Sequence, residues 1–150
     1  MMVCADKANR RLYVFDEEYR HGMLNTDIVK MLKAKGLEKQ KIIVDSAEPK
    51  SAEELRRSGI IRVKRVKKFN DSVIHGIQFL QGWEIIVHPR CKNTIEELEN
   101  YGWKKIKGTQ NEYDNKPIDE YNHCLDALRY AVEDLMPQGK IRTFKNTFGM

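Results

Sequence analysis

Two separate segments of the chain carry side chains that could bind a metal ion. Asp45 comes directly after the apolar run KIIV, residues 41–44, which predicts a strand buried on both faces. Functional residues of open α/β sheets gather at the carboxyl ends of strands, where a carboxylate is held rigidly yet can face a cleft. His123 and Asp126 lie three residues apart in a segment with helical spacing, so they share one face of the helix. An acid on a strand end and a pair on a final helix could therefore supply one site.

Such a ligand set consists mostly of oxygen atoms, which suits magnesium or manganese, and the imidazole favours manganese. Two such ions, roughly 3.5–4 Å apart, can clamp the attacking and leaving oxygens of a phosphodiester. Structural roles remain open for each residue. Asp45 could cap a turn or the next helix, and Asp126 could pair with Arg129, which is also three residues along. Glu48 and Glu133 are possible additional ligands, whereas we interpret His21, His75 and His88 as structural or surface residues.

The net charge of +5 is concentrated locally, and basic clusters favour a polyanion such as nucleic acid. The alternative is a solvated charged face. The residues expected to contact nucleic acid are Lys64, Arg65, Lys67, Lys68, Lys104, Lys105 and Lys107.

The length of 150 residues fits one domain, with an expected flexible basic tail at residues 137–150. No apolar run is long enough to span a bilayer and no signal-peptide pattern is present, so we expect a cytosolic protein without membrane partners. The three cysteines include no CxxC pair, which predicts free thiols and no zinc knuckle. The sequence contains no GxxxxGK[ST] or GxGxxG loop, so it does not predict a bound nucleotide or another organic cofactor.

Strands alternate with helices along the chain, which predicts an α/β domain with a central mixed sheet flanked by helices. The first two strands should form a hairpin around a turn at residues 6–9, and residues 103–117 a second hairpin or an extended loop. Helices are expected at residues 25–35, 51–58, 71–81, 94–101 and 119–135, and further strands at 41–44, 60–66 and 84–88. The buried stripe of the last helix should consist of Leu125, Leu128, Val132 and Leu135. Their expected N-caps are Asn25 or Thr26, Asn70 or Asp71, and Thr94, which would form a capping box with Glu97.

Three motifs resemble the C-terminal nuclease domain of tailed-phage large terminase subunits. They are DSAEPKSAEELRRSGI at residues 45–60, FNDSVIHGIQFLQGWEIIVHPRCKNTIEELENYGWKK at 69–105, and NKPIDEYNHCLDALRYAVE at 115–133. The last motif is long and specific, and the likeness extends over nearly the whole chain. It implies a ribonuclease-H-like fold and a metal-dependent endonuclease that cuts concatemeric double-stranded DNA in the bacterial host cytoplasm. Asp45, His123 and Asp126 would be its catalytic, metal-binding residues, with two Mn²⁺ or Mg²⁺ ions in an intact site. Its partners would be the terminase ATPase domain, the small subunit and the portal.

Family members carry a further catalytic aspartate on a first strand. Asp6 falls in the expected turn and Asp16 on the second strand, so neither occupies that place. We therefore expect an N-terminally incomplete nuclease domain over residues 1–136, whose first strand is truncated and whose activity is impaired. One alternative is a non-catalytic module that binds DNA or a packaging partner. Another is a resolvase or transposase core of the same superfamily, against which the last motif argues.

Overall fold

The N-terminal hairpin leads into a three-stranded mixed sheet. The computed structural model describes residues 1–47, 49–68, 71–108 and 112–137. Strand β1 (Met2–Asp6) pairs antiparallel with β2 (Arg11–Asp16), which pairs parallel with β5 (Glu84–Val87). The Asp6 carboxylate accepts hydrogen bonds from the amides of Ala8 and Asn9 and stabilises the turn. The predicted hairpin and the mixed character of the sheet are confirmed.

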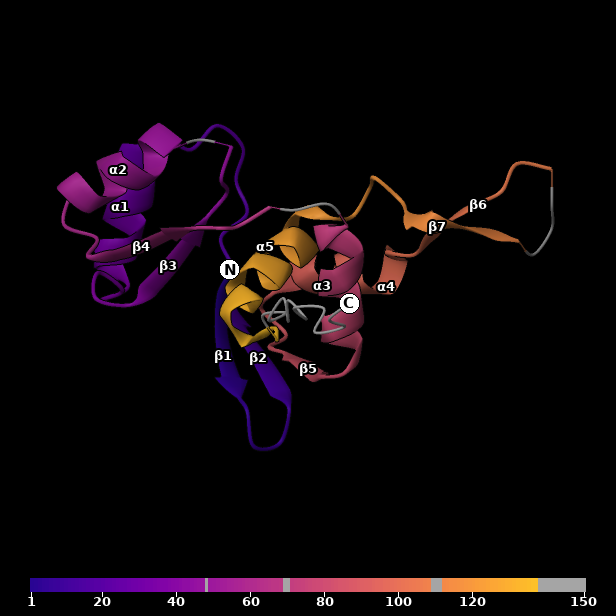
Figure 1. Ribbon diagram of the computed structural model, residues 1–150. Coiled ribbons are helices and arrows are strands. Elements are labelled where there is room, and N and C mark those ends of the chain that lie inside the picture. The colour runs from indigo at the N-terminus through magenta and orange to yellow at the C-terminus, as the bar shows by residue number, and fades with distance from the viewer. Residues whose placement is uncertain (48, 69–70, 109–111, 138–150) are drawn as a thin grey trace, which may run out of the picture.

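A second, two-stranded sheet lies beside the first (Figure 1). Strand β3 (Lys41–Val44) pairs parallel with β4 (Arg62–Arg65), and α2 (Pro49–Arg57) connects them. Helix α1 (Asn25–Ala34) packs against α2. The buried residues of this unit are Val29, Leu32, Ala52, Leu55, Ile60 and Val63. Gly36 and Gly59, with φ of +67° and +95°, end the two helices in a conformation that side chains disfavour.

The predicted burial of β3 on both faces is wrong. All four of its residues are partly exposed, because β4 is its single strand partner among the described residues. Ion pairs connect this sheet with the rest of the molecule. The ammonium groups of Lys41 and Lys64 lie 3.2 and 3.1 Å from the carboxylate of Asp134, which belongs to the short 3-10 helix η1 (Glu133–Leu135).

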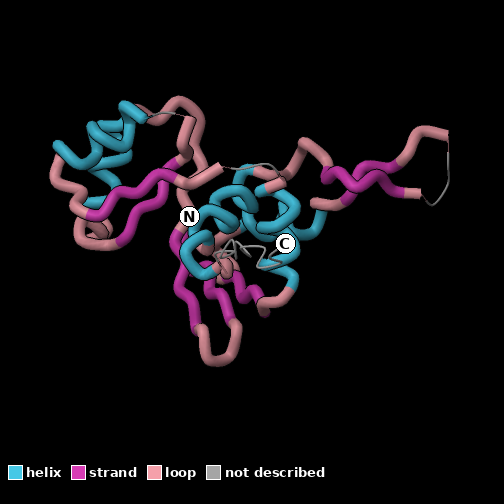
Figure 2. Tube along the Cα trace, viewed as in Figure 1, coloured by secondary structure: helices cyan, strands magenta, loops and turns pink. Residues whose placement is uncertain are grey.

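Helices α3 (Ser72–Gln81) and α5 (His123–Ala131) lie beside the three-stranded sheet (Figure 2). The buried core between them comprises Leu12, Val14, Leu80, Cys91, Leu128 and Val132. Of the apolar stripe predicted for the last helix, Leu125, Leu128 and Val132 are buried, whereas Leu135 is partly buried and lies in η1. The helix itself starts at His123 rather than at residue 119, and the preceding Tyr121 has a positive φ of 55°.

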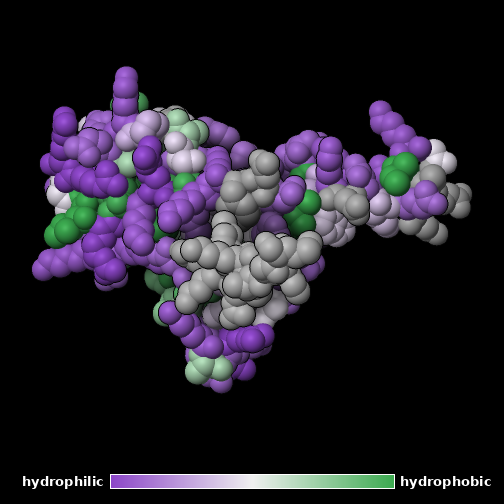
Figure 3. Space-filling view, viewed as in Figure 1, coloured by the Kyte–Doolittle hydropathy of each residue, from purple (hydrophilic) through white to green (hydrophobic). Residues whose placement is uncertain are grey.

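Helix α4 (Lys92–Asn100) leads into a hairpin of β6 (Trp103–Lys105) and β7 (Tyr113–Pro117), which extends away from the body of the molecule (Figure 1). The second predicted hairpin is thus confirmed. Figure 3 shows a mostly hydrophilic surface with scattered apolar patches on the face in view. Across the described ranges, every helix is too short or too polar to cross a lipid bilayer. The cysteines are free thiols, as predicted, with Cys91 and Cys124 buried and Cys4 exposed.

Helix starts differ from the predicted ones. The N-cap of α1 is Leu24, and Asp71 precedes α3 without making a side-chain capping bond. Asn70, the alternative cap, lies outside the described residues. Helix α4 begins at Lys92 after Cys91, so the predicted capping box of Thr94 and Glu97 is wrong. Both side chains are buried within the helix and bind other elements instead.

Candidate functional site

Asp45 lies immediately after β3 and forms an ion pair with a lysine side chain. One carboxylate oxygen lies 2.7 Å from the ammonium of Lys68 and the other 2.9 Å from it. The carboxylate also accepts a hydrogen bond from the amide of Ala47 at 2.9 Å, so the turn-capping role is present as well. The hydrogen bond from Lys68 lowers the pKa of Asp45 below its usual value. Because the side chain is 46% exposed, this ionised carboxylate is accessible from solvent.

Lys68 connects Asp45 to the last helix. Its ammonium lies 5.8 Å from the ring centroid of Tyr130 in α5. Strand β3 also packs against α5, so the strand-end acid and the helix that carries the other two predicted ligands are neighbours in the fold. Such a cation over an aromatic face is attracted by the ring's electron density.

Asp126 is engaged in the salt bridge that its spacing allowed. The guanidinium of Arg129 donates to its carboxylate and also lies 5.4 Å from the Tyr130 ring centroid. Arg129 is buried, with a side chain 6% exposed, whereas the Asp126 side chain is 36% exposed. The Arg129 side chain packs against Gly76 of α3, where a side chain would clash, since a Cβ there would lie 2.8 Å from the Arg129 Cδ. The two predicted metal-binding acids therefore each carry a protein cation, and both cations lie at one tyrosine ring.

His123, the first residue of α5, is exposed and lines a surface pocket. Its ring centroid is 6.3 Å from that of Tyr19. Both residues line a pocket of about 290 Å³ together with Glu17, Glu18 and His21. Asp45 and Asp126 do not line this pocket. His123 thus shares a helix with Asp126, but its imidazole lies beside the segment that follows β2.

The donor chemistry of these residues fits a divalent cation only in part. Asp45 and Asp126 are solvent-accessible carboxylates that already hold cations. Within the described ranges, however, no three His, Cys, Asp or Glu side chains are grouped closely enough to hold a metal ion. Glu133, a possible additional ligand, instead accepts a hydrogen bond from the Lys67 amide at 2.6 Å. Glu48 lies outside the described residues.

The predicted nucleic-acid contacts divide into two groups. Three of them form ion pairs within the protein: Lys68 with Asp45, Lys64 with Asp134, and Lys104 with Asp119 at 2.6 Å. The remaining four have exposed side chains and are Arg65, Lys67, Lys105 and Lys107. Charge that is already paired attracts a polyanion less strongly, so the second group is better placed to contact one.

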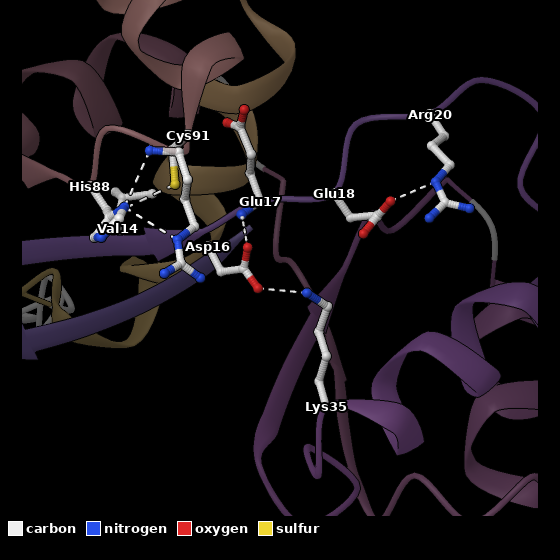
Figure 4. A network of polar contacts seen from close by, with 9 residues as sticks. Val14, Asp16, Glu17, Glu18, Arg20, Lys35, His88 and Cys91 are labelled. Carbon is white, nitrogen blue, oxygen red and sulfur yellow. Dashed lines mark hydrogen bonds and ion pairs between the residues drawn. The ribbon is translucent and has the colours of Figure 1, made fainter.

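Glu17 is a functional candidate that sequence reasoning missed. Its carboxylate accepts hydrogen bonds from the amide and side chain of Asn93, at 2.8 and 2.9 Å, and of Thr94, at 3.0 and 2.6 Å. Burial acts to raise the pKa of Glu17, but these hydrogen bonds outweigh it and lower the pKa. Figure 4 shows the adjacent acids, with Asp16 bound to Lys35 and the Glu17 carboxylate pointing away from that pair.

The sequence predicts that Glu97 caps its own helix, α4, but in the structure its partner is α5. Its carboxylate accepts hydrogen bonds from the amides of Cys124 and Leu125 at 2.7 and 3.0 Å. The residue is only 5% exposed. Its spacing from Thr94 places both on one helix face, and this was the available signal that the face is buried and polar.

Comparison with known proteins identifies this architecture. A family model described as the terminase RNAseH-like domain matches residues 1–134. The chain belongs to the terminase ribonuclease-H-like domain family. The predicted family and its ribonuclease-H-like fold are thereby confirmed.

Two curated relatives of this family are phage terminase subunits. The chain is 34% identical over 143 residues to the terminase large subunit of Bacillus phage SPP1, which covers 91% of this chain and 32% of that protein. It is 31% identical over 134 residues to the PBSX phage terminase large subunit of Bacillus subtilis strain 168, with coverage of 88% and 30%. The chain thus spans about a third of the length of these relatives.

Two solved structures share the fold. The nuclease domain of the large terminase g2p from bacteriophage SPP1, with bound Mn, superposes with a TM-score of 0.81 and 33% identity. That match covers 89% of this chain and 76% of the SPP1 domain. The large terminase of the thermophilic bacteriophage D6E gives a TM-score of 0.60 at 24% identity over 85% of this chain and 34% of its own, which supports the fold alone.

Proposed function

We propose that this chain is the divalent-metal-dependent endonuclease domain of a phage DNA-packaging terminase, and that its substrate is concatemeric double-stranded DNA. The observation that carries the proposal is the solvent-accessible carboxylate of Asp45 at the end of β3, next to the helix α5 that bears His123 and Asp126. The similarity to a nuclease domain with bound Mn supports it, because that relative shares both the fold and a third of the sequence.

Asp45, His123 and Asp126 are the residues proposed to hold Mn²⁺ or Mg²⁺. A divalent ion at such a site supplies Lewis acidity toward a phosphodiester and lowers the pKa of a bound water. The side chains of this protein contribute the negative charge that retains the cation. Lys68 and Arg129 show that both acids accept positive charge, and exchange of Lys68 would free Asp45.

The proposed partners follow from the family and the charge distribution. Double-stranded DNA would lie against the exposed basic residues Arg65, Lys67, Lys105 and Lys107. Backbone phosphates attract such side chains without reading sequence. In a packaging complex the domain would act with the terminase ATPase domain, the small subunit and the portal, in the cytoplasm of the bacterial host.

Mutation of the proposed ligands tests this function. Purified chain is incubated with supercoiled plasmid and Mn²⁺, and Mn²⁺ binding is measured in parallel by electron paramagnetic resonance. Asp45→Asn and Asp126→Asn should each weaken Mn²⁺ binding by at least about 10- to 100-fold, the loss typical when even an outer-shell partner of a metal ligand is removed, and should reduce cutting accordingly. Asp16→Asn is the matched control, because Asp16 is also a strand-end acid paired with a lysine. Equal cutting and binding by all four proteins would reject the proposed ligands.

A non-catalytic DNA-binding module is the second candidate. It is favoured by the absence of a three-ligand metal group among the described residues and by the pairing of both acids with protein cations. This candidate predicts salt-sensitive DNA binding that is independent of metal. DNA affinity that is unchanged by chelation, together with no Mn²⁺ binding, would favour it over the nuclease.

A further inference from the structure

The first turn of α5 lacks a cap from its own chain segment. Asn122, the N-cap residue, makes no side-chain capping hydrogen bond. The first amides of a helix have no acceptor inside the helix and need one from elsewhere. In α5 that acceptor is the carboxylate of Glu97, which is reached by the amides of Cys124 and Leu125.

Glu97 is well suited to fix the start of this helix. It projects from the buried face of α4, so its carboxylate is held by the packing of a second helix rather than by a flexible loop. Two hydrogen bonds from consecutive amides define both the direction and the rotation of the first turn. A carboxylate at a helix N-terminus is also favoured by the helix dipole.

The helix that carries Glu97 is anchored in turn. The four hydrogen bonds to Glu17 hold Asn93 and Thr94 in the first turn of α4. Since Glu17 directly follows β2, its carboxylate ties α4 to the end of the central strand of the three-stranded sheet. The start of α5 is therefore connected to the sheet through two carboxylates in series, that of the partly buried Glu17 and that of the buried Glu97.

We propose that Glu97 is a positioning residue for the metal ligands of α5: its carboxylate orients the turn that presents His123 and Asp126. This inference rests on the proposed metal-binding function. His123 directly precedes the first amide that Glu97 binds, and Asp126 follows the second, so any rotation of these amides moves both side chains. Glu97 itself makes no contact with a reacting atom and acts through the helix.

Three variants separate positioning from simple stabilisation. Glu97→Ala removes the single oxygen, Oε2, that accepts from both amides, whereas Glu97→Gln retains an oxygen that can accept from the same amides. Val132→Ala is the control, because Val132 is 1% exposed in the core at the opposite end of α5, and its truncation weakens packing without touching the first turn. Each protein is assayed for global stability by urea unfolding, for amide exchange of Cys124 and Leu125 by NMR, and for Mn²⁺ affinity.

Glu97→Ala should exchange these two amides at least about tenfold faster and should bind Mn²⁺ about 10- to 100-fold more weakly. Glu97→Gln should restore most of both properties, and Val132→Ala should bind Mn²⁺ within about twofold of the wild type. Unchanged amide exchange in Glu97→Ala would overturn the inference. So would equal losses of Mn²⁺ affinity in Glu97→Ala and Val132→Ala. Failure of the wild-type chain to bind Mn²⁺ would instead reject the proposed function, while amide exchange would still report whether Glu97 holds the helix.

Discussion

Lys68 places its ammonium 2.7 Å from the carboxylate of Asp45, across 23 positions of sequence. The contact joins the end of β3 to the segment that follows β4, and the same ammonium lies over Tyr130 of α5. A lysine here has two effects on a divalent ion. It lowers the pKa of Asp45, so that the carboxylate stays ionised and able to bind metal at lower pH, and it occupies the carboxylate, which opposes metal binding.

Replacement of Lys68 decides which effect dominates. Lys68→Gln should bind Mn²⁺ about two- to fivefold more tightly, because an exposed ion pair is worth only about 0.5–1 kcal/mol and a competing charge is removed. Titration with Mn²⁺ followed by electron paramagnetic resonance measures this change. Lys30→Gln, at an exposed position of α1, is the control for net charge. Weaker binding by Lys68→Gln than by the control would contradict the competition.

Exposed and paired basic residues should contribute unequally to DNA binding. Arg65→Ala and Lys67→Ala are each expected to lower the slope of log affinity against log salt by about 0.9, the value for one phosphate contact. Lys64→Ala should change the slope less, because Lys64 is paired with Asp134. Fluorescence anisotropy with a labelled duplex over a range of salt provides the slopes. Identical slopes for all three variants and the wild type would place the DNA elsewhere.

Asp134 should make stability depend on pH. Hydrogen bonds from Lys64 and then Lys41 lower its pKa in the folded protein below the unfolded value of 3.8. A lowered folded pKa means that the stabilisation is present above the unfolded pKa and is lost as the pH falls through the folded pKa. At neutral pH, Asp134→Asn should therefore lower the free energy of unfolding by about 0.5–1 kcal/mol, since the side chain is partly exposed.

The difference between Asp134→Asn and the wild type should shrink as the pH falls below the unfolded pKa, and it should vanish once the wild-type carboxyl is protonated in the folded protein as well. Urea unfolding at a series of pH values measures it. A difference that persists undiminished in acid would show that the ion pairs are not its source.

Gly76 should resist substitution, although alanine is the better helix former. A Cβ at Gly76 would lie 2.8 Å from Cδ and 3.2 Å from Cγ of the buried Arg129. Overpacking costs about 1–3 kcal/mol, which exceeds the gain of about 1 kcal/mol from helix propensity. We expect Gly76→Ala to lose about 1 kcal/mol in urea unfolding. A Cβ at Gly102 would have no neighbouring atom within 4 Å, so Gly102→Ala should change the free energy of unfolding little. A stabilised Gly76→Ala would mean that Arg129 moves aside freely.

Much of the fold could be predicted because its elements are defined locally. Apolar spacing predicted the burial of Leu125, Leu128 and Val132, although not the partial exposure of Leu135, and turn chemistry predicted the hairpin at Asp6. Helix starts were less predictable, because capping here depends on partners distant in sequence. Thr94 donates its hydroxyl to Glu17, 77 positions away, and Glu97 binds amides of α5.

The candidate site was predictable in its chemistry and less so in its environment. The strand-end position of Asp45 and the pairing of Asp126 with Arg129 both follow from spacing. The contact of Lys68 with Asp45 does not follow from spacing, because it depends on the path of the segment that leads from β4 toward α5. Burial of β3 was overestimated for a related reason: an apolar run reports side-chain type, whereas exposure depends on how many strands pair with it.

The most direct test of the proposed metal site is the position of Mn²⁺ in a crystal of this chain, located by its anomalous scattering. We predict a peak in contact with Asp45 and with His123 or Asp126 of α5, and displacement of the Lys68 ammonium from Asp45. A crystal soaked in Mn²⁺ that shows no peak there, with Lys68 still bound to Asp45, would contradict it. So would a peak confined to the pocket of Glu17, Glu18 and His21.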